Sequence, residues 1–206
     1  MISNKIKKYF ENILVVDEVE VGTFPQAKIE NFSSCTFTGF NFDMITDLVY
    51  CKYYRKKPKS CDVLKLFDKR IDFIEIKTLD ITEVRTFGSK IGKEYKLIKK
   101  LEASYELIKK IIENEKEFDN INDLDLLVKI QKLFCVAIYF KFNLDKDNGE
   151  QFAITQRCNI FKKHLSAYFI ANPLPYGENF IDEPNLLSVN SIGSNIETID
   201  GFYKRL

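Results

Sequence analysis

One short run of residues limits the possible folds more than any other feature of the sequence. Residues 133–142 have the sequence LFCVAIYFKF and are apolar, β-branched or aromatic at nearly every position. The run is much shorter than the ~20 residues that a membrane-spanning helix needs. Strands that are apolar on both faces are typical of sheets covered on both sides. The run therefore predicts a central strand, in an α/β fold whose mixed sheet is flanked by helices.

Residues 60–79 predict a β-hairpin. Two β-prone runs, residues 60–67 and 71–79, are separated by the polar turn 68–70. Because side chains alternate between the two faces of a strand, Glu75 and Lys77 are expected to point the same way.

Amphipathic patterns predict helices around these strands. We expect helices over residues 3–12, 43–54, 89–117 and 157–170. The exposed face of the third is expected to carry Lys93, Lys96, Lys99, Lys100, Lys109 and Lys110. The remaining expectations are a β-branched run at 13–21, loop and short strand at 22–42, a strand at 151–156 after the turn 145–149, and irregular chain at 172–206.

Composition limits the function as well as the fold. The chain has 206 residues, 45% of them hydrophobic, and we expect residues 1–206 to form a single domain. Lysine and arginine number 31 against 30 aspartates and glutamates, so net charge alone does not indicate a nucleic-acid partner. We find neither a membrane span nor a secretory signal, and we expect a cytoplasmic protein with no membrane contact.

Cysteine and histidine offer little chemistry in this chain. The five cysteines form no C-x-x-C pair, and His164 is the single histidine. Zinc clusters and histidine-centred triads are therefore poorly supported. Residues 88–94 lack the spacing of a phosphate-binding loop. Any catalysis must depend on carboxylates and lysine.

The hairpin contains the residue types that phosphodiester hydrolysis requires. Asp62 lies in its first strand, and Glu75, Ile76 and Lys77 follow one another in its second. Carboxylates bind Mg²⁺ or Mn²⁺, and a lysine orients or activates water and stabilises negative charge. Paired strands lie ~4.8 Å apart, so one carboxylate from each can reach a shared ion. The backbone carbonyl of Ile76 is a further candidate ligand.

This arrangement resembles the PD-(D/E)XK nuclease superfamily, which has a restriction-endonuclease-like α-β-β-β-α-β core. Asp62 matches the family's aspartate, Cys61 replaces the proline before it, and residues 75–77 match the D/E-x-K segment. The resemblance covers approximately residues 43–142. It implies a Mg²⁺-dependent deoxyribonuclease, with restriction-type endonucleases as one form.

The same resemblance implies a further acid on the first helix of the core. Asp47 corresponds best to this metal ligand, and Glu11 and Glu20 are alternatives. A two-fold homodimer is also expected by analogy, because one small subunit does not easily span both strands of a duplex.

A basic, tyrosine-rich segment directly precedes Asp62. Residues 50–59 contain no acid, and lysine or arginine binds phosphates while tyrosine stacks on bases. We expect DNA as the partner and do not exclude RNA. The candidate nucleic-acid contacts are Lys52, Tyr53, Tyr54, Arg55, Lys56, Lys57, Lys59, Lys93 and Lys96.

Other interpretations remain open. Glu-x-Lys occurs again at residues 94–96, so residues 75–77 are equally consistent with an ordinary charge pair on a solvated face. One alternative is a catalytically inactive nuclease-fold module that binds nucleic acid or protein. Another is a viral or plasmid-borne accessory protein whose hairpin matches by coincidence.

Overall fold

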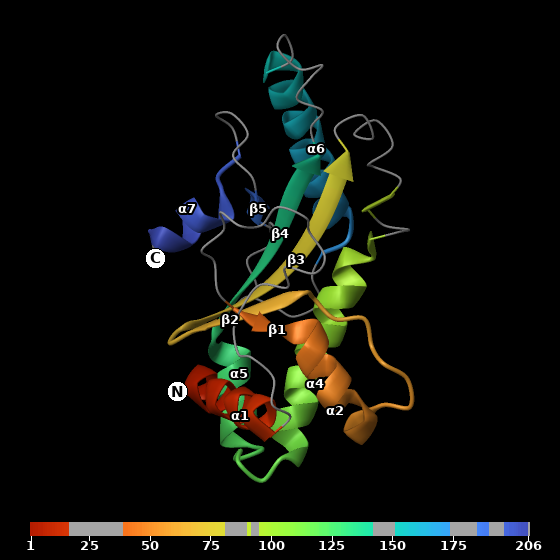
Figure 1. Ribbon diagram of the computed structural model, residues 1–206. Coiled ribbons are helices and arrows are strands. Elements are labelled where there is room, and N and C mark those ends of the chain that lie inside the picture. Colours follow the sequence, from red (N-terminus) through yellow and green to blue (C-terminus); the bar gives the residue numbers. More distant parts are fainter. Residues whose placement is uncertain are drawn as a thin grey trace.

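The computed structural model describes residues 1–16, 39–80, 90–91, 95–141, 151–173, 185–189 and 196–205 (Figure 1). The helices are α1 (Ile2–Val16), α2 (Phe42–Tyr53), α4 (Leu97–Asn114), α5 (Asn122–Lys129), α6 (Gln151–Ala171) and α7 (Ile199–Lys204). The strands are β1 (Phe40–Asn41), β2 (Val63–Phe67), β3 (Arg70–Asp80), β4 (Gln131–Lys141) and β5 (Asn185–Ser188).

The strands form one mixed sheet in the order β1-β2-β3-β4-β5. β2 is antiparallel to both β1 and β3, whereas β4 runs parallel to β3 and β5 runs parallel to β4. The predicted hairpin and the predicted central strand are both confirmed. Pairing between β3 and β4 extends from Arg70 opposite Gln131 to Asp80 opposite Lys141.

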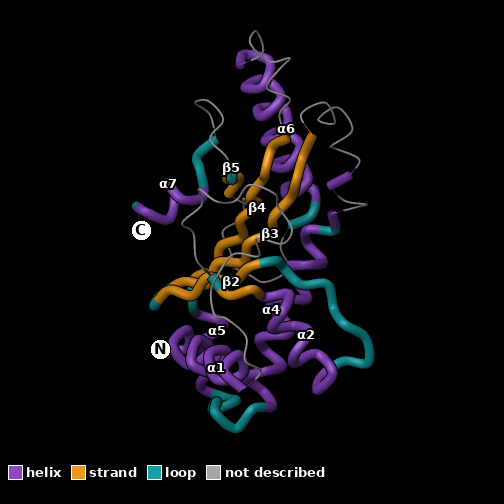
Figure 2. The backbone as a smooth tube through the Cα atoms, viewed as in Figure 1, coloured by secondary structure: helices purple, strands orange, loops and turns teal. Residues whose placement is uncertain are grey.

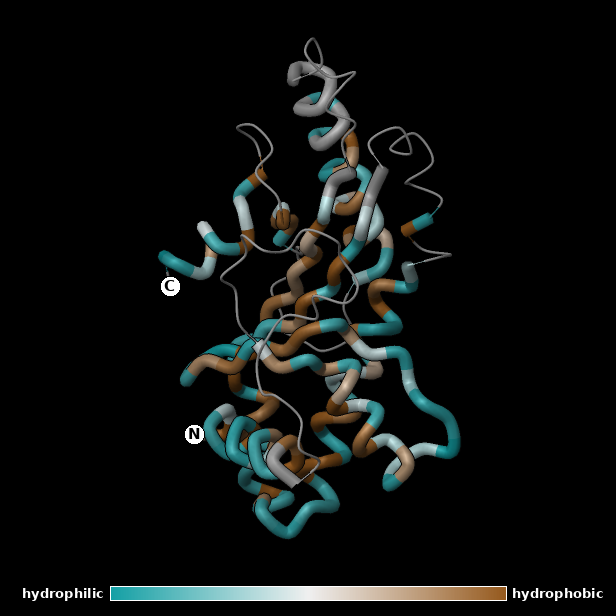
Figure 3. Tube along the Cα trace, viewed as in Figure 1, coloured by the Kyte–Doolittle hydropathy of each residue, from teal (hydrophilic) through white to brown (hydrophobic). Residues whose placement is uncertain are grey.

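Most helices pack on one face of this sheet. Phe73 of β3 and Phe134 of β4 lie in a buried cluster with Leu101 of α4, Phe10 of α1 and Phe161 of α6. Figure 2 shows α1, α2, α4 and α5 grouped beside β1 and β2, and Figure 3 shows hydrophobic residues along β3 and β4.

A smaller cluster covers the opposite face. Ile74 of β3, Cys135 of β4, Leu187 of β5 and Ile199 of α7 are its buried members. The α/β fold with a mixed sheet flanked by helices is therefore confirmed.

Two sequence predictions for the C-terminal half are wrong. Residues 151–156, expected as a strand, begin helix α6. Their short alternating pattern is outweighed by a helical stripe further along, in which Phe161, Leu165 and Phe169 are all buried. Residues 172–206, expected to be irregular, contain β5 and α7.

Helix bounds also differ from those expected. Residues 13–16 continue α1 because Leu14 extends its buried stripe. The long helix expected at 89–117 is α4 over Leu97–Asn114. It starts late because Lys96 adopts left-handed backbone geometry, φ 51°, which a helix cannot continue through.

The chain order around the hairpin has one difference from the expected core. The described residues place two strands, β2 and β3, between α2 and α4, and the third strand of the meander, β1, precedes α2. The expectations for residues 17–38 and for the turn 145–149 fall outside the described residues. Within the described part of the chain, no helix has the length and apolar character to cross a membrane.

Replacing Lys96 with glycine tests the left-handed start of α4. We expect Lys96→Gly to raise the free energy of unfolding by roughly 0.5 kcal/mol, because the relieved backbone strain of about 1–2 kcal/mol exceeds the entropy cost of glycine. Chemical denaturation measures the change. The control Lys99→Gly, inside α4, should lower stability by about 1 kcal/mol. Equal losses in both variants would contradict this backbone geometry.

Candidate active site

The hairpin positions Asp62 and Glu75 at the point where β2 and β3 separate. The last paired residues are Val63 and Ile74, so Asp62 and Glu75 come next on the two chains. Leu64 and Phe73, two residues from each acid, belong to the cluster beneath α4. Because side chains alternate, both carboxylates face α4.

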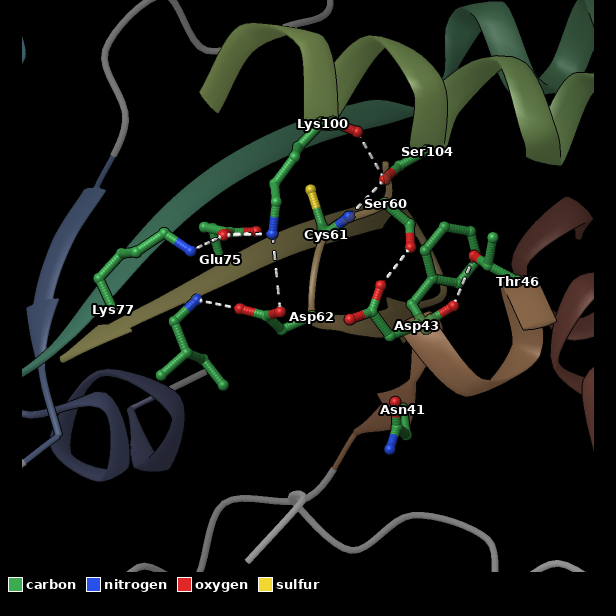
Figure 4. A network of polar contacts seen from close by, with 12 residues as sticks. Asn41, Asp43, Thr46, Ser60, Cys61, Asp62, Glu75, Lys77, Lys100 and Ser104 are labelled. Carbon is green, nitrogen blue, oxygen red and sulfur yellow. Dashed lines mark hydrogen bonds and ion pairs between the residues drawn. The ribbon is translucent and has the colours of Figure 1, made fainter. Parts of the chain in front are cut away.

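Two lysine side chains converge on the carboxylates of Glu75 and Asp62 (Figure 4). Glu75 Oε1 accepts a short hydrogen bond from Lys77 Nζ and a second, at 2.6 Å, from Lys100 Nζ of α4. Lys100 Nζ also lies 3.8 Å from Asp62 Oδ1. One ammonium group therefore bridges the two carboxylates, and the structure brings Asp62, Glu75 and Lys77 together as the sequence predicted.

Asp62 replaces the missing strand partner of β3. Its Oδ2 accepts a hydrogen bond from the backbone N–H of Ile76 at 2.7 Å. In a strand, the N–H and C=O of one residue face the same neighbour. The Ile76 carbonyl is therefore expected at the same edge as the Asp62 carboxylate, where a metal ligand would have to lie.

Hydroxyl groups attach this edge to the helices. Ser104 Oγ of α4 donates to the Lys100 carbonyl and accepts from the N–H of Cys61, both at 2.8 Å. Ser60 Oγ donates to Asp43 Oδ1 of α2 at 2.6 Å. The residues just before Asp62 are thus bound to α4 and to α2.

Burial makes the ionised form of the Glu75 carboxylate unfavourable. Glu75 is fully buried, and burial followed by the charge of Asp62 raises its pKa despite the two lysines. Burial lowers the pKa of Lys100, but Glu75 and Asp62 outweigh this effect and raise that pKa to about 12. Burial also raises the pKa of the Cys61 thiol, which argues against a thiolate nucleophile here.

A second buried acid on β3 provides an internal comparison. Asp72 lies on the opposite face, where Arg70 donates to its two oxygens at 2.6 and 2.9 Å and Tyr203 of α7 donates at 2.8 Å. Both Asp72 oxygens are satisfied. In contrast, Glu75 Oε2 is buried and has no hydrogen-bond partner among the described residues. Such an orphaned oxygen favours a ligand, since buried polar atoms are otherwise satisfied.

The donor set fits a magnesium-type ion with few protein ligands. The described residues contain no group of three or more acidic, histidine or cysteine side chains able to hold a metal. Mg²⁺, however, is commonly held by one or two carboxylates, with water and substrate phosphate completing its octahedron. Asp62, Glu75 and the Ile76 carbonyl provide this kind of set, and no described residue donates a hydrogen bond to Glu75 Oε2.

The structure does not bring the other predicted acids to this cluster. Asp47 lies one turn beyond the start of α2, where it is exposed and pairs with Lys57 at 2.6 Å. The α2 acid attached to this edge is Asp43, through Ser60. Glu11 pairs with Lys7 at 3.8 Å, and Glu20 falls outside the described residues.

The basic segment divides into two parts. Lys52 and Tyr53 both bind Glu115, and Tyr54 packs against the core, so these side chains stabilise the fold. The remaining predicted contacts upstream of Asp62 are exposed: Arg55, Lys56, Lys57 and Lys59. Lys96 is half-exposed, and Lys93 falls outside the described residues.

Sequence reasoning missed Lys100 and Ser104. Lys100, expected on the exposed face of the long helix, is partly buried against Glu75. The signal was present, because Lys100 is three or four residues from the buried Leu97 and Ser104. A lysine at helical spacing from buried residues indicates a buried carboxylate in the sheet on which the helix packs.

Comparisons with protein-family models, with curated proteins and with solved structures each gave no match to this chain.

Removing the Ser104 hydroxyl tests the attachment of Asp62 to α4. We expect Ser104→Ala to lower the free energy of unfolding by about 1–3 kcal/mol, because the buried Cys61 N–H loses its acceptor. Thermal and urea denaturation measure this. Ser166→Ala on the half-exposed side of α6 is the control, with a change within about 0.5 kcal/mol. Similar values for both variants would show that Ser104 is not a structural link.

Proposed function

We propose that this protein is a metal-dependent nuclease that hydrolyses phosphodiester bonds in DNA. The observation that supports this proposal is the convergence of Asp62, Glu75 and Lys77 at the end of the hairpin, where one Glu75 oxygen has no hydrogen-bond partner in the described part of the chain. Metal-assisted hydrolysis uses carboxylates to hold the ion and a lysine to stabilise negative charge, and these three residues supply those groups.

Each residue has a distinct role in this proposal. Asp62, Glu75 and the Ile76 carbonyl hold Mg²⁺ or Mn²⁺, which supplies Lewis-acid stabilisation of the phosphate. Lys77 is anchored by Glu75 and lies near the Tyr95 ring, with its nitrogen 5.6 Å from the ring centre. Its side chain is 19% exposed, so the ammonium can orient a water molecule and stabilise developing negative charge.

Sheet topology supports the family resemblance. Taking α1 as the first helix, the order α1-β1-β2-β3-α4-β4 corresponds to α-β-β-β-α-β, with α2 inserted between β1 and β2 and α5 before β4. We propose a restriction-endonuclease-like core on this basis, which begins earlier than residue 43 and includes β1.

DNA is the proposed substrate because of the exposed cations upstream of the site. Arg55, Lys56, Lys57 and Lys59 lie between α2 and β2, and the chain continues directly from them into Ser60 and Asp62. Cations along the path to the cleavage site favour a polyanionic substrate. A homodimer that cuts both strands, and cleavage of RNA, stay open predictions.

A second candidate function follows from Lys100. Its ammonium group already contacts both carboxylates, so among the described residues two lysines offset the two acids without a metal. This observation favours the alternative of a nuclease-fold module that binds nucleic acid or protein without cleaving it.

Variants at the two ends of the hairpin distinguish these functions. We expect Asp62→Asn and Lys77→Met each to lower Mg²⁺-dependent cleavage of plasmid and linear DNA at least ~100-fold, because a ligand or a charge-stabilising group is lost. The matched controls Asp68→Asn and Lys69→Met change the same residue types in the exposed turn. Absence of cleavage by the wild-type protein would favour the inactive module, and full cleavage by Asp62→Asn would show that the active site lies elsewhere.

Neutralising the exposed basic residues tests DNA binding separately. We expect the quadruple change of Arg55, Lys56, Lys57 and Lys59 to glutamine to weaken binding and to reduce the dependence of log K on log salt concentration, because fewer counterions are released. Fluorescence anisotropy with labelled duplex at several salt concentrations measures both. Lys162→Gln with Lys163→Gln, exposed on α6, is the control. An unchanged salt dependence would show that DNA binds to another surface of the protein.

A further inference from the structure

We propose that Lys100 is a built-in counter-cation that neutralises Asp62 and Glu75 in the metal-free protein and competes with a divalent cation for the same carboxylates. This inference rests on the proposed function, because it concerns the metal site of that nuclease. It makes Lys100 a positioning residue whose removal changes metal affinity.

The contacts of Lys100 are those of a bridging cation. Its Nζ lies 2.6 Å from Glu75 Oε1 and 3.8 Å from Asp62 Oδ1, and it comes from α4 while both acids come from the hairpin. Without it, the two carboxylates would lie close together at a buried edge, and Lys77 would remain to offset the charge of Glu75. Like charges in such a position destabilise one another.

The charge balance of the cluster explains the competition. Asp62 and Glu75 carry two negative charges, and Lys77 and Lys100 carry two positive charges. A divalent ion bound to the same acids would add two more positive charges within a few ångströms of both ammonium groups. Repulsion at that distance in a partly buried site is strong, so binding requires one ammonium group to move away.

Lys100 is the group that moves. It contacts both proposed ligands, whereas Lys77 contacts Glu75 and has the Tyr95 ring beside it. The Lys100 side chain is 17% exposed and lies in the first turn of α4, so rotation of its long stem carries the charge to solvent. Glu75 Oε2 has no partner among the described residues, which leaves one acceptor of the site open before any such movement.

Metal titration without nucleic acid tests the inference. We expect Lys100→Met and Lys100→Gln to bind Mn²⁺ about tenfold more tightly than the wild-type protein, because the competing charge is removed. Isothermal titration calorimetry of each full-length protein with MnCl₂ measures the dissociation constants. The control Lys99→Met removes an exposed lysine from the neighbouring position and should keep the wild-type constant.

Thermal melting supplies an independent measurement. Metal-free Lys100→Met should melt below Lys99→Met, and saturating Mn²⁺ should raise its midpoint more than it raises that of the wild-type protein. Circular dichroism at 20 °C shows whether each variant is folded. If Lys100→Met is unfolded, Lys100→Gln replaces it in this comparison.

The outcomes separate this inference from the proposed function. Unchanged or weaker Mn²⁺ binding in both Lys100 variants, in a wild-type protein that cleaves DNA, overturns the inference and leaves the nuclease standing. Tight binding by the variants alone supports the inference and favours the inactive module for the wild-type chain. Absence of binding in every variant overturns both proposals.

Discussion

Burying Glu75 beneath α4 is possible because two lysines compensate its charge, one from its own strand and one from the helix. An ionised carboxylate in an apolar interior is strongly unfavourable unless it is paired. Lys77 is available because alternation along β3 places it on the same face. Lys100 is available because Lys96 fixes the start of α4 one turn earlier, and the Lys100 N–H bonds the Lys96 carbonyl at 3.0 Å. The geometry of the candidate site therefore depends on where this helix begins.

The comparison of Glu75 with Asp72 separates a structural acid from a ligand candidate on the same strand. Arg70 and Tyr203 satisfy both oxygens of Asp72, and the contact with Tyr203 attaches α7 to the sheet. Glu75 has one satisfied oxygen and one for which the described ranges offer no hydrogen-bond partner. Both acids have a pKa raised by burial, so the shift alone does not distinguish them. The hydrogen bonds to their oxygens do distinguish the two acids.

Local sequence patterns were sufficient to predict the parts of the fold that depend on a single strand or a single hairpin. The hairpin, the buried strand β4 and the shared face of Glu75 and Lys77 all follow from alternation and turn composition. The start of α4 does not follow from such patterns, because nothing in the residue type of Lys96 predicts its left-handed backbone. Lys100 was expected on the exposed face for a different reason, because its spacing from Leu97 and Ser104 was not taken into account. The strand expected at 151–156 failed for a related reason, since six residues cannot indicate a helix whose buried stripe lies further along.

The unequal lengths of β2 and β3 have a mechanical consequence. β3 is held in register with β4 along its whole length, so Glu75 moves only with the sheet. Asp62 lies before the first residue of β2, and Ser104 of α4 holds the N–H of the residue that precedes it. The Asp62 carboxylate also accepts a hydrogen bond from the Ile76 N–H of β3, so it is held to the same strand as Glu75, while the residue before it is held to α4. Helix α4 therefore supplies both the hydroxyl that holds the backbone before Asp62 and the ammonium group that binds Glu75, so a displacement of this one helix would disturb both contacts together.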